Sequence, residues 1–265
     1  MSKLPGENFA VGPLLLGGYR EHLRAVYGFA RLVDQVGDES PGDRGVLLGA
    51  VEDELDRAFA GTARHPLFRR LAATVAERAL PREPFLRLIE ANRLDQHVSR
   101  WESWEDLLGY CRLSANPVGE LALHVFGAAS AENVALSDRV CTGLQVVEHL
   151  QDIREDSRSG RVYLPAEDMA RFGVTRPDLD AARASGALRR LVAFELGRVR
   201  ELLDSGPPLV RRLRGRPRLA VAGYVAGGRS AAAAVERAGY DVLGAPARPS
   251  RARRGVETLR LAVAA

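Results

Sequence analysis

The amino-acid sequence predicts an all-α fold, and three observations support that prediction. Apolar residues recur at spacings of three and four residues along most of the 265-residue chain, which is the period of one helix face. Strict alternation of apolar and polar residues over the length of a strand is nearly absent. Prolines stand between the periodic segments, where they stop or start a helix because proline lacks the N–H donor.

The periodic segments are the predicted helices. The first two run through Leu23 to Val33 and through Leu47 to Phe59. The others, in chain order, are Pro66 to Ala79, Pro84 to His97, Glu105 to Ser114, Val118 to Phe126, Ser137 to Asp156, Gly186 to Asp204 and Arg218 to Arg237. Asn116-Pro117 interrupts the pattern between Trp104 and Phe126, and this break is either a kink that opens a pocket wall or a boundary between two helices.

Length and composition predict a single domain. We expect it to span residues 1–265, with a core over about residues 8–240 and a basic C-terminal tail over about residues 245–265. Cys111 and Cys141 lie far apart and outside any CxxC pattern, so neither a disulfide framework nor a zinc site is expected. No segment has the pattern of a signal peptide or the roughly 18 to 20 apolar residues that cross a bilayer. A cytoplasmic protein is therefore expected.

Positive charge collects late in the chain. The formal net charge is +4, and arginines cluster in residues 211–216 and 248–254. Nucleic acid is not an expected partner, because no aromatic residues are interleaved there and no nucleic-acid-binding motif occurs. Anionic lipid headgroups fit better, since each basic residue near such a surface contributes about 1 kcal/mol. The sequence leaves open either peripheral membrane contact or a solvated, arginine-rich surface.

Carboxylates form two stripes on predicted helices. Glu148, Asp152 and Asp156 stand at i, i+4 and i+8, and Asp34 and Asp38 repeat the i, i+4 pair far upstream. Like charges at this spacing repel, so the chain has either solvated them or matched them with cations. Two such stripes facing each other would suit Mg²⁺, which takes oxygen ligands and is usually held by a few carboxylates plus substrate phosphates.

Spacing alone is weak evidence for a metal site. The pairs Glu52/Asp56 and Glu102/Asp106 have the same spacing, and we interpret them as solvated helix faces. The two stripes differ from these pairs because they end apolar helices. The second stripe is also followed at once by residues 159–165, a loop that would bring an arginine and a tyrosine near its acidic end.

Longer motifs surround the stripes. They are Tyr27-Gly28-Phe29-Ala30-Arg31 leading into Asp34 and Asp38, then Tyr110-Cys111, Gln145 through Asp156, and Gly160 through Pro165. In order and separation over nearly the whole chain, these motifs resemble the squalene/phytoene synthase family. Within the family, Glu7-Asn8-Phe9 and residues 110–119 resemble the bacterial hydroxysqualene synthase branch.

The resemblance implies an isoprenoid synthase fold with a central cavity and a Mg²⁺-diphosphate site at its mouth. The implied metal ligands are Asp34, Asp38, Glu148, Asp152 and Asp156. The implied diphosphate-binding residues are Arg31, Gln145, Arg161 and Tyr163, and a catalytic role falls to Tyr110 and Arg31. The chain departs from the family pattern in Gln35, which replaces an acidic residue, and in Glu148, where relatives commonly have Asn. Arg248 and Arg251 are the candidates for a C-terminal diphosphate arginine.

The implied substrate is presqualene diphosphate, ionised with Mg²⁺ and captured by water to give hydroxysqualene without a reductant. Phe29, Tyr110 and Phe126 offer π faces to a carbocation, although each also fits an ordinary core. An alternative within the fold is head-to-head condensation of farnesyl or geranylgeranyl diphosphate. A non-catalytic scaffold is disfavoured by the retained aspartates. A phosphohydrolase is disfavoured because the histidines show no paired spacing, and His149 is expected to point off the acidic stripe.

Overall fold

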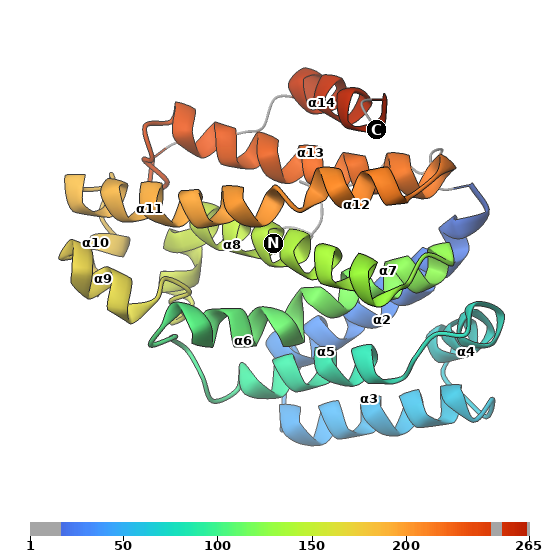
Figure 1. Cartoon of the computed structure of the whole chain (residues 1–265). Coiled ribbons are helices and arrows are strands. Elements are labelled where there is room, and N and C mark those ends of the chain that lie inside the picture. Colours follow the sequence, from blue (N-terminus) through green and yellow to red (C-terminus); the bar gives the residue numbers. More distant parts are fainter. Residues whose placement is uncertain (1–16, 245–250, 264–265) are drawn as a thin grey trace. The chain divides into compact units, whose positions relative to one another are not determined.

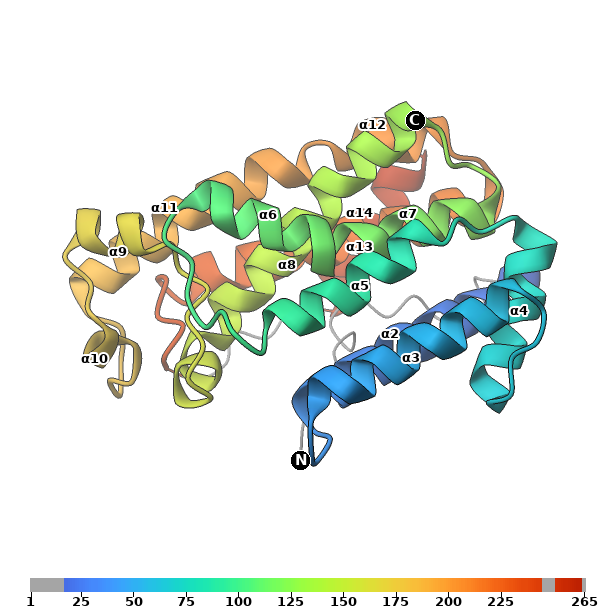
Figure 2. The same cartoon turned by 90° about the horizontal axis from the view of Figure 1, so that it is seen from below.

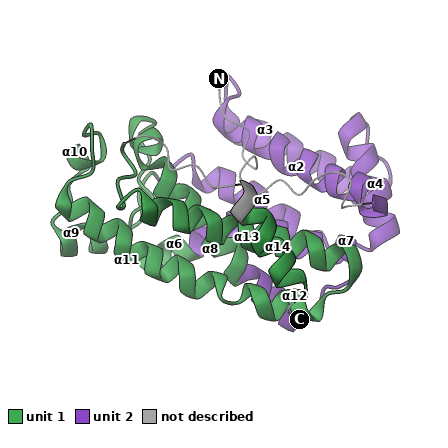
Figure 3. Cartoon of the chain, turned by 90° about the horizontal axis from the view of Figure 1, so that it is seen from above, with its two compact units in different colours: residues 1–16, 99–108, 139–265 green, residues 17–98, 109–138 purple. Residues whose placement is uncertain are grey.

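The computed structural model describes residues 17–244 and 251–263, and it confirms the all-α prediction. The described residues form helices and connecting loops with no strand beyond one isolated bridge between Arg100 and Val162 (Figure 1). The chain makes two compact units, one of residues 1–16, 99–108 and 139–265 and the other of residues 17–98 and 109–138 (Figure 3). None of the described helices combines the length and apolar composition needed to cross a bilayer.

The unit of residues 17–98 and 109–138 carries the first acidic stripe. Its elements are η1 (Gly17–Tyr19), α2 (Arg20–Asp38), α3 (Arg44–Phe59), α4 (Pro66–Arg78), α5 (Glu83–Leu94), the end of α6 (Trp104–Ser114), α7 (Asn116–Phe126) and the start of α8 (Ala131–Arg158). Helices α2 and α3 run side by side (Figure 2). Phe29 on α2 is fully buried and meets Phe68 and Phe85 edge to face, so it is a core residue of this unit and not a lining residue.

The other unit carries the second acidic stripe and is built on the longest helix. Its elements are the start of α6, most of α8, then α9 (Ala166–Phe172), α10 (Arg176–Leu179), α11 (Gly186–Leu203), α12 (Gly206–Arg212), α13 (Gly215–Arg237) and α14 (Arg251–Val263). Helix α13 is rich in alanine and glycine, and these small residues let its neighbours approach closely. A Cβ on Gly228 would lie 2.6 Å from a methyl group of Leu144 on α8.

Local sequence signals explain most helix boundaries. Asp43 accepts a hydrogen bond from the backbone N–H of Val46, and Ser185 accepts one from that of Leu188, which satisfies donors that the first turn of a helix leaves open. The break at Asn116-Pro117 is a boundary and not a kink. Helix α6 ends at Ser114, and Pro117 lies in the first turn of α7, where its missing N–H costs nothing.

Four of the described α-helices were not predicted. Helices α9 and α10 are only seven and four residues long, too short for their periodicity to stand out. Helix α12 begins at Gly206 and carries Pro207 and Pro208 in its first turn, and it is only seven residues long. Helix α14 forms within the segment described as a basic tail.

A buried ion cluster connects α9 and α11. Arg198 donates hydrogen bonds to Asp168 at 2.6 Å and to Glu195 at 3.1 Å, and its guanidinium lies 4.6 Å from the ring of Trp104. Both carboxylates are almost fully buried, and they share the single guanidinium of Arg198 among the residues that the structure describes. Burial, opposed by Arg198 and reinforced by Asp168, raises the pKa of Glu195 to about 7.

Replacing Glu195 with glutamine should make the protein more stable in alkaline solution. Because its folded pKa lies above the ordinary value of 4.5, the stability that Glu195 contributes is present below about pH 4.5 and is lost as the pH rises through about 7. The neutral amide in Glu195→Gln should therefore raise the free energy of unfolding at pH 8 by about 1 to 3 kcal/mol. Urea denaturation at pH 5 and pH 8 measures this effect, and an equal difference at both pH values would contradict it.

Candidate active site

The first acidic stripe lies at the C-terminal end of α2. Asp34 is half-buried and Asp38 is exposed, one turn apart as the spacing predicts. Burial, with a further contribution from the nearby Asp38, raises the pKa of Asp34 to about 6, while Asn92 and Arg31 oppose the shift. Arg31 also pairs with Glu39 at 3.4 Å. The stripe thus concentrates negative charge at the end of α2, which Arg31 offsets in part, and such an environment favours a cation.

Side chains of helix α5 and of the residues just after it form hydrogen bonds that hold the first acidic stripe in place. The Asn92 amide donates to the Asp34 carboxylate at 3.4 Å and to the Leu88 carbonyl at 3.2 Å, and Gln96 donates to the Gly37 carbonyl at 3.0 Å. Gly37 makes this approach possible, because a Cβ there would lie only 2.1 Å from the Asn92 side-chain oxygen. The glycine between the two aspartates is therefore a packing requirement of the stripe.

Replacing Gly37 with alanine should displace the Asn92 side chain and break its hydrogen bond to Asp34. Overpacking of this kind costs about 1 to 3 kcal/mol, which outweighs the roughly 1 kcal/mol that alanine gains over glycine inside a helix. The matched control is Gly49→Ala on α3, where nothing lies within 4 Å of the added Cβ, so this variant should be slightly stabilised. Thermal unfolding compares the two, and equal stabilisation of both would contradict the packing role of Gly37.

Tyr110 belongs to the same unit as the first acidic stripe, and its side chain contacts Asp95 at the C-terminal end of α5. It is almost fully buried, and its hydroxyl donates to the Asp95 carboxylate at 3.0 Å. Asp95 in turn contributes to the raised pKa of Asp34. The hydrogen bond fixes the orientation of the Tyr110 ring next to the acidic stripe, as a cavity-wall role would require.

The second acidic stripe lies in the last three turns of α8. Burial, with a further contribution from Asp152, raises the pKa of Glu148 to about 7, while Asp152 itself is exposed. Asp156 is half-buried, and its Oδ2 atom is buried without a hydrogen-bond donor among the described residues. A buried carboxylate oxygen of this kind is costly unless a cation or ligand completes it.

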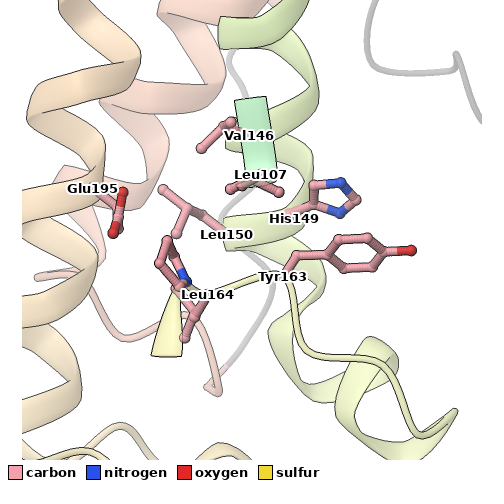
Figure 4. Close-up of a pocket in the computed structure, with 8 residues that line it drawn as sticks. Leu107, Val146, His149, Leu150, Tyr163, Leu164 and Glu195 are labelled. Carbon is pink, nitrogen blue, oxygen red and sulfur yellow. The ribbon is translucent and has the colours of Figure 1, made fainter. Parts of the chain in front are cut away.

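His149 lies against the second stripe, contrary to expectation. Its Nδ1 is 3.6 Å from Oδ2 of Asp156, and its Nε2 is 3.1 Å from the Gln145 amide nitrogen. If the amide donates, the imidazole proton is on Nδ1 and faces Asp156. The ring stacks on Tyr163 with centroids 3.6 Å apart and planes 11° apart, as Figure 4 shows from the side. Residues seven apart share a helix face, so periodicity could have placed His149 beside Asp156.

The loop after α8 delivers Arg161 and Tyr163 to this end of the helix, as predicted. Its backbone is tied to residues 99–101 by hydrogen bonds from Val162 to Ser99 and from Ala166 to Trp101. Two small pockets lie here, each with a cavity volume of about 10 Å³. The first is lined by His149, Tyr163, Leu107, Val146, Leu150 and Leu164 (Figure 4), and the second includes Asp156 and Arg161. Both are smaller than the roughly 300 Å³ of a typical ligand site, so they are niches beside the stripe and not the expected prenyl cavity.

The donors present fit Mg²⁺. They are carboxylates, and the Oδ2 atom of Asp156 is buried without a hydrogen-bond partner among the described residues. Within the described ranges, no three His, Cys, Asp or Glu side chains converge closely enough to hold a metal ion by themselves. Mg²⁺ is usually bound by one or two carboxylates and completed by phosphate oxygens and water, so this arrangement suits a metal that arrives with its diphosphate. Metal binding stays a prediction.

The structure joins the predicted residues into two groups. Arg31, Asp34, Asp38 and Tyr110 belong to one unit, and Gln145, Glu148, Asp152, Asp156, Arg161 and Tyr163 belong to the other. That the two stripes face each other around a central cavity, and that the chain is one domain, stay predictions. Asn92, Asp95, Gln96 and His149 were missed. Glu7-Asn8-Phe9 and Arg248 lie outside the described residues, as does the side chain of Arg251.

Comparisons with known proteins all identify relatives from one family. The family model described as squalene/phytoene synthase matches residues 3–254. The hydroxysqualene synthases of Rhodopseudomonas palustris and Zymomonas mobilis are 34% and 35% identical over 211 and 201 residues, or 78% and 74% of this chain and 72% and 67% of those proteins. The 15-cis-phytoene synthase of Synechococcus elongatus is 29% identical over 251 residues, or 89% of this chain and 82% of that protein.

Solved structures agree with this match. The structure of squalene synthase HpnC from Alicyclobacillus acidocaldarius is 47% identical, with a TM-score of 0.84 over 88% of this chain and 89% of that one. A dehydrosqualene synthase with 24% identity and the same TM-score shows the same fold. The predicted isoprenoid synthase fold is confirmed, and the chain belongs to the squalene/phytoene synthase family of enzymes.

Proposed function

We propose that this enzyme converts presqualene diphosphate to hydroxysqualene, with Mg²⁺ bound at the two acidic stripes. The observation that carries the proposal is the buried, unsatisfied Oδ2 atom of Asp156 in a stripe whose other members are also carboxylates. The similarity to hydroxysqualene synthases from two organisms supports this substrate over others of the family.

In the proposed reaction, the diphosphate leaves first, and the residues of the two stripes stabilise its charge. When bound, Mg²⁺ would neutralise the charge that grows on the diphosphate as its bond to carbon breaks. Asp34, Asp38, Asp152 and Asp156 would hold the metal, with Glu148 as an additional ligand. Arg31 and Arg161 would donate charge-assisted hydrogen bonds to phosphate oxygens, and Gln145 and Tyr163 would complete the binding of the diphosphate.

The cyclopropylcarbinyl cation that remains must rearrange before water reaches it. The Tyr110 hydroxyl is committed to Asp95, so the ring is held in one orientation and can offer its face to positive charge. Water then adds to the rearranged cation and loses a proton, which gives the alcohol. No electrons are gained, so the reaction needs no reductant.

Product analysis tests this proposal. Purified protein with Mg²⁺ should convert presqualene diphosphate to hydroxysqualene, identified by gas chromatography and mass spectrometry. Squalene or dehydrosqualene from the same substrate would overturn the water-capture step.

Head-to-head condensation is the second candidate, and the similarity to a phytoene synthase over 89% of the chain favours it. In that case, farnesyl or geranylgeranyl diphosphate alone would give presqualene diphosphate or phytoene, so parallel incubations separate the two activities. Turnover of none of these substrates would favour a non-catalytic scaffold of the same fold.

Peripheral membrane contact is part of the proposal, because the lipid product of either reaction would partition into membranes.

A further inference from the structure

Exposed apolar side chains gather on one helix. Six large apolar residues are exposed among the described residues, and three of them, Val256, Leu259 and Val263, lie on α14. Their side chains are 68%, 62% and 80% exposed. They stand at i, i+3 and i+7, so they form one continuous stripe along the helix. Scattered apolar residues need no explanation, but a helical stripe of them is typical of a contact surface.

The opposite face of α14 attaches the helix to its own unit. Leu261 is buried, and Glu257 pairs with Arg229 of α13 at 3.2 Å. Helix α14 runs along α13 in the opposite direction, so its C-terminal end points toward the turn between α12 and α13 (Figure 1). The stripe is therefore the outward face of a helix whose inward face is already packed.

Exposed arginines lie on α14 and near the turn toward which its C-terminal end points. Arg260 is exposed and follows Val256 by one turn, so it shares the outward face. Arg211 at the end of α12, Arg214 just before α13 and Arg216 in the first turn of α13 are also exposed. This charge argues against a second copy as the occupant of the stripe, since two such surfaces would bring like charges together. It complements an anionic lipid surface, where apolar residues enter the headgroup boundary and arginines meet phosphates.

We infer that α14 is an interfacial helix, and that the stripe of Val256, Leu259 and Val263 docks the enzyme on anionic membranes. The inference does not depend on which prenyl diphosphate the enzyme uses.

Vesicle co-sedimentation of the full chain tests the docking. Vesicles of phosphatidylcholine alone are compared with vesicles that also contain phosphatidylglycerol, at low and high salt. The wild type should bind the anionic vesicles, and binding should weaken with salt as exposed charges are screened. The triple variant Val256→Gln, Leu259→Gln and Val263→Gln should lose at least tenfold in partitioning, because the apolar contribution is removed while every arginine stays.

A matched control removes exposed apolar residues elsewhere. Val46→Gln and Val118→Gln, at sites 68% and 43% exposed, should leave vesicle binding unchanged. In a separate variant, Arg211→Gln, Arg214→Gln and Arg216→Gln should weaken binding by up to about fivefold per residue and reduce the salt dependence. Circular dichroism and turnover in detergent confirm that each variant is folded.

Three outcomes would overturn the inference. They are failure of the wild type to bind anionic vesicles at low salt, equal binding by wild type and the stripe variant, and dimerisation that the stripe variant abolishes. The last would mean that a second copy covers the stripe. Loss of hydroxysqualene formation in the product analysis would leave the docking result standing, so the two proposals fail separately.

Discussion

Replacing Asp152 with asparagine should lower the turnover of presqualene diphosphate by about 10²- to 10³-fold, the usual cost of removing one group that stabilises transition-state charge. The physical reason is that asparagine keeps the shape of the side chain but removes the negative charge that would hold Mg²⁺ against the leaving diphosphate. Asp152 is exposed on α8, so the substitution should leave the unfolding temperature nearly unchanged. Turnover and unfolding temperature, measured on the same preparation, separate loss of chemistry from loss of fold.

Asp56→Asn is the matched control for this variant. Glu52 and Asp56 on α3 have the same i, i+4 spacing as the acidic stripes, but Arg82 contacts both of them and Asp56 is exposed. Loss of a surface ion pair costs about 0 to 1 kcal/mol, so turnover in this variant should match the wild type. Equal activity of Asp152→Asn and Asp56→Asn would remove Asp152 from the metal set.

Replacing His149 with alanine should lower turnover by about 10- to 100-fold, the range typical of residues that orient metal ligands from the second layer. His149 is the group that faces the buried Oδ2 atom of Asp156, and it also contacts Gln145 and stacks on Tyr163. Without the imidazole, these three side chains lose their common support. The Mg²⁺ concentration needed for half-maximal activity should rise, because Asp156 is no longer held in one orientation.

A binding measurement makes the role of His149 falsifiable without turnover. Isothermal titration of Mg²⁺ together with inorganic diphosphate should show weaker binding by His149→Ala than by the wild type. Tyr163→Phe keeps the aromatic face for stacking and should retain most of the Mg²⁺ affinity that His149→Ala loses. Unchanged Mg²⁺ dependence in His149→Ala, with only a lower unfolding temperature, would mean that the histidine is a packing residue.

The fold class and most candidate site residues could be predicted from the amino-acid sequence alone. Helical periodicity is a local property, so α2 through α8, α11 and α13 could all be predicted. The i, i+4 spacing likewise placed Asp34 with Asp38 and Asp152 with Asp156, because one helix carries both members of each pair.

The groups that support those carboxylates depend on long-range packing. Asn92 and Asp95 are distant in sequence from Asp34, and they act on it because α5 packs against α2 at Gly37. The raised pKa of Glu148 and the unsatisfied oxygen of Asp156 depend on burial, which no local pattern encodes. The outward stripe of α14 also became visible only when Leu261 was seen to pack inward. Sequence spacing specifies which residues share a helix face, whereas the packing of segments distant in sequence decides which residues each face contacts.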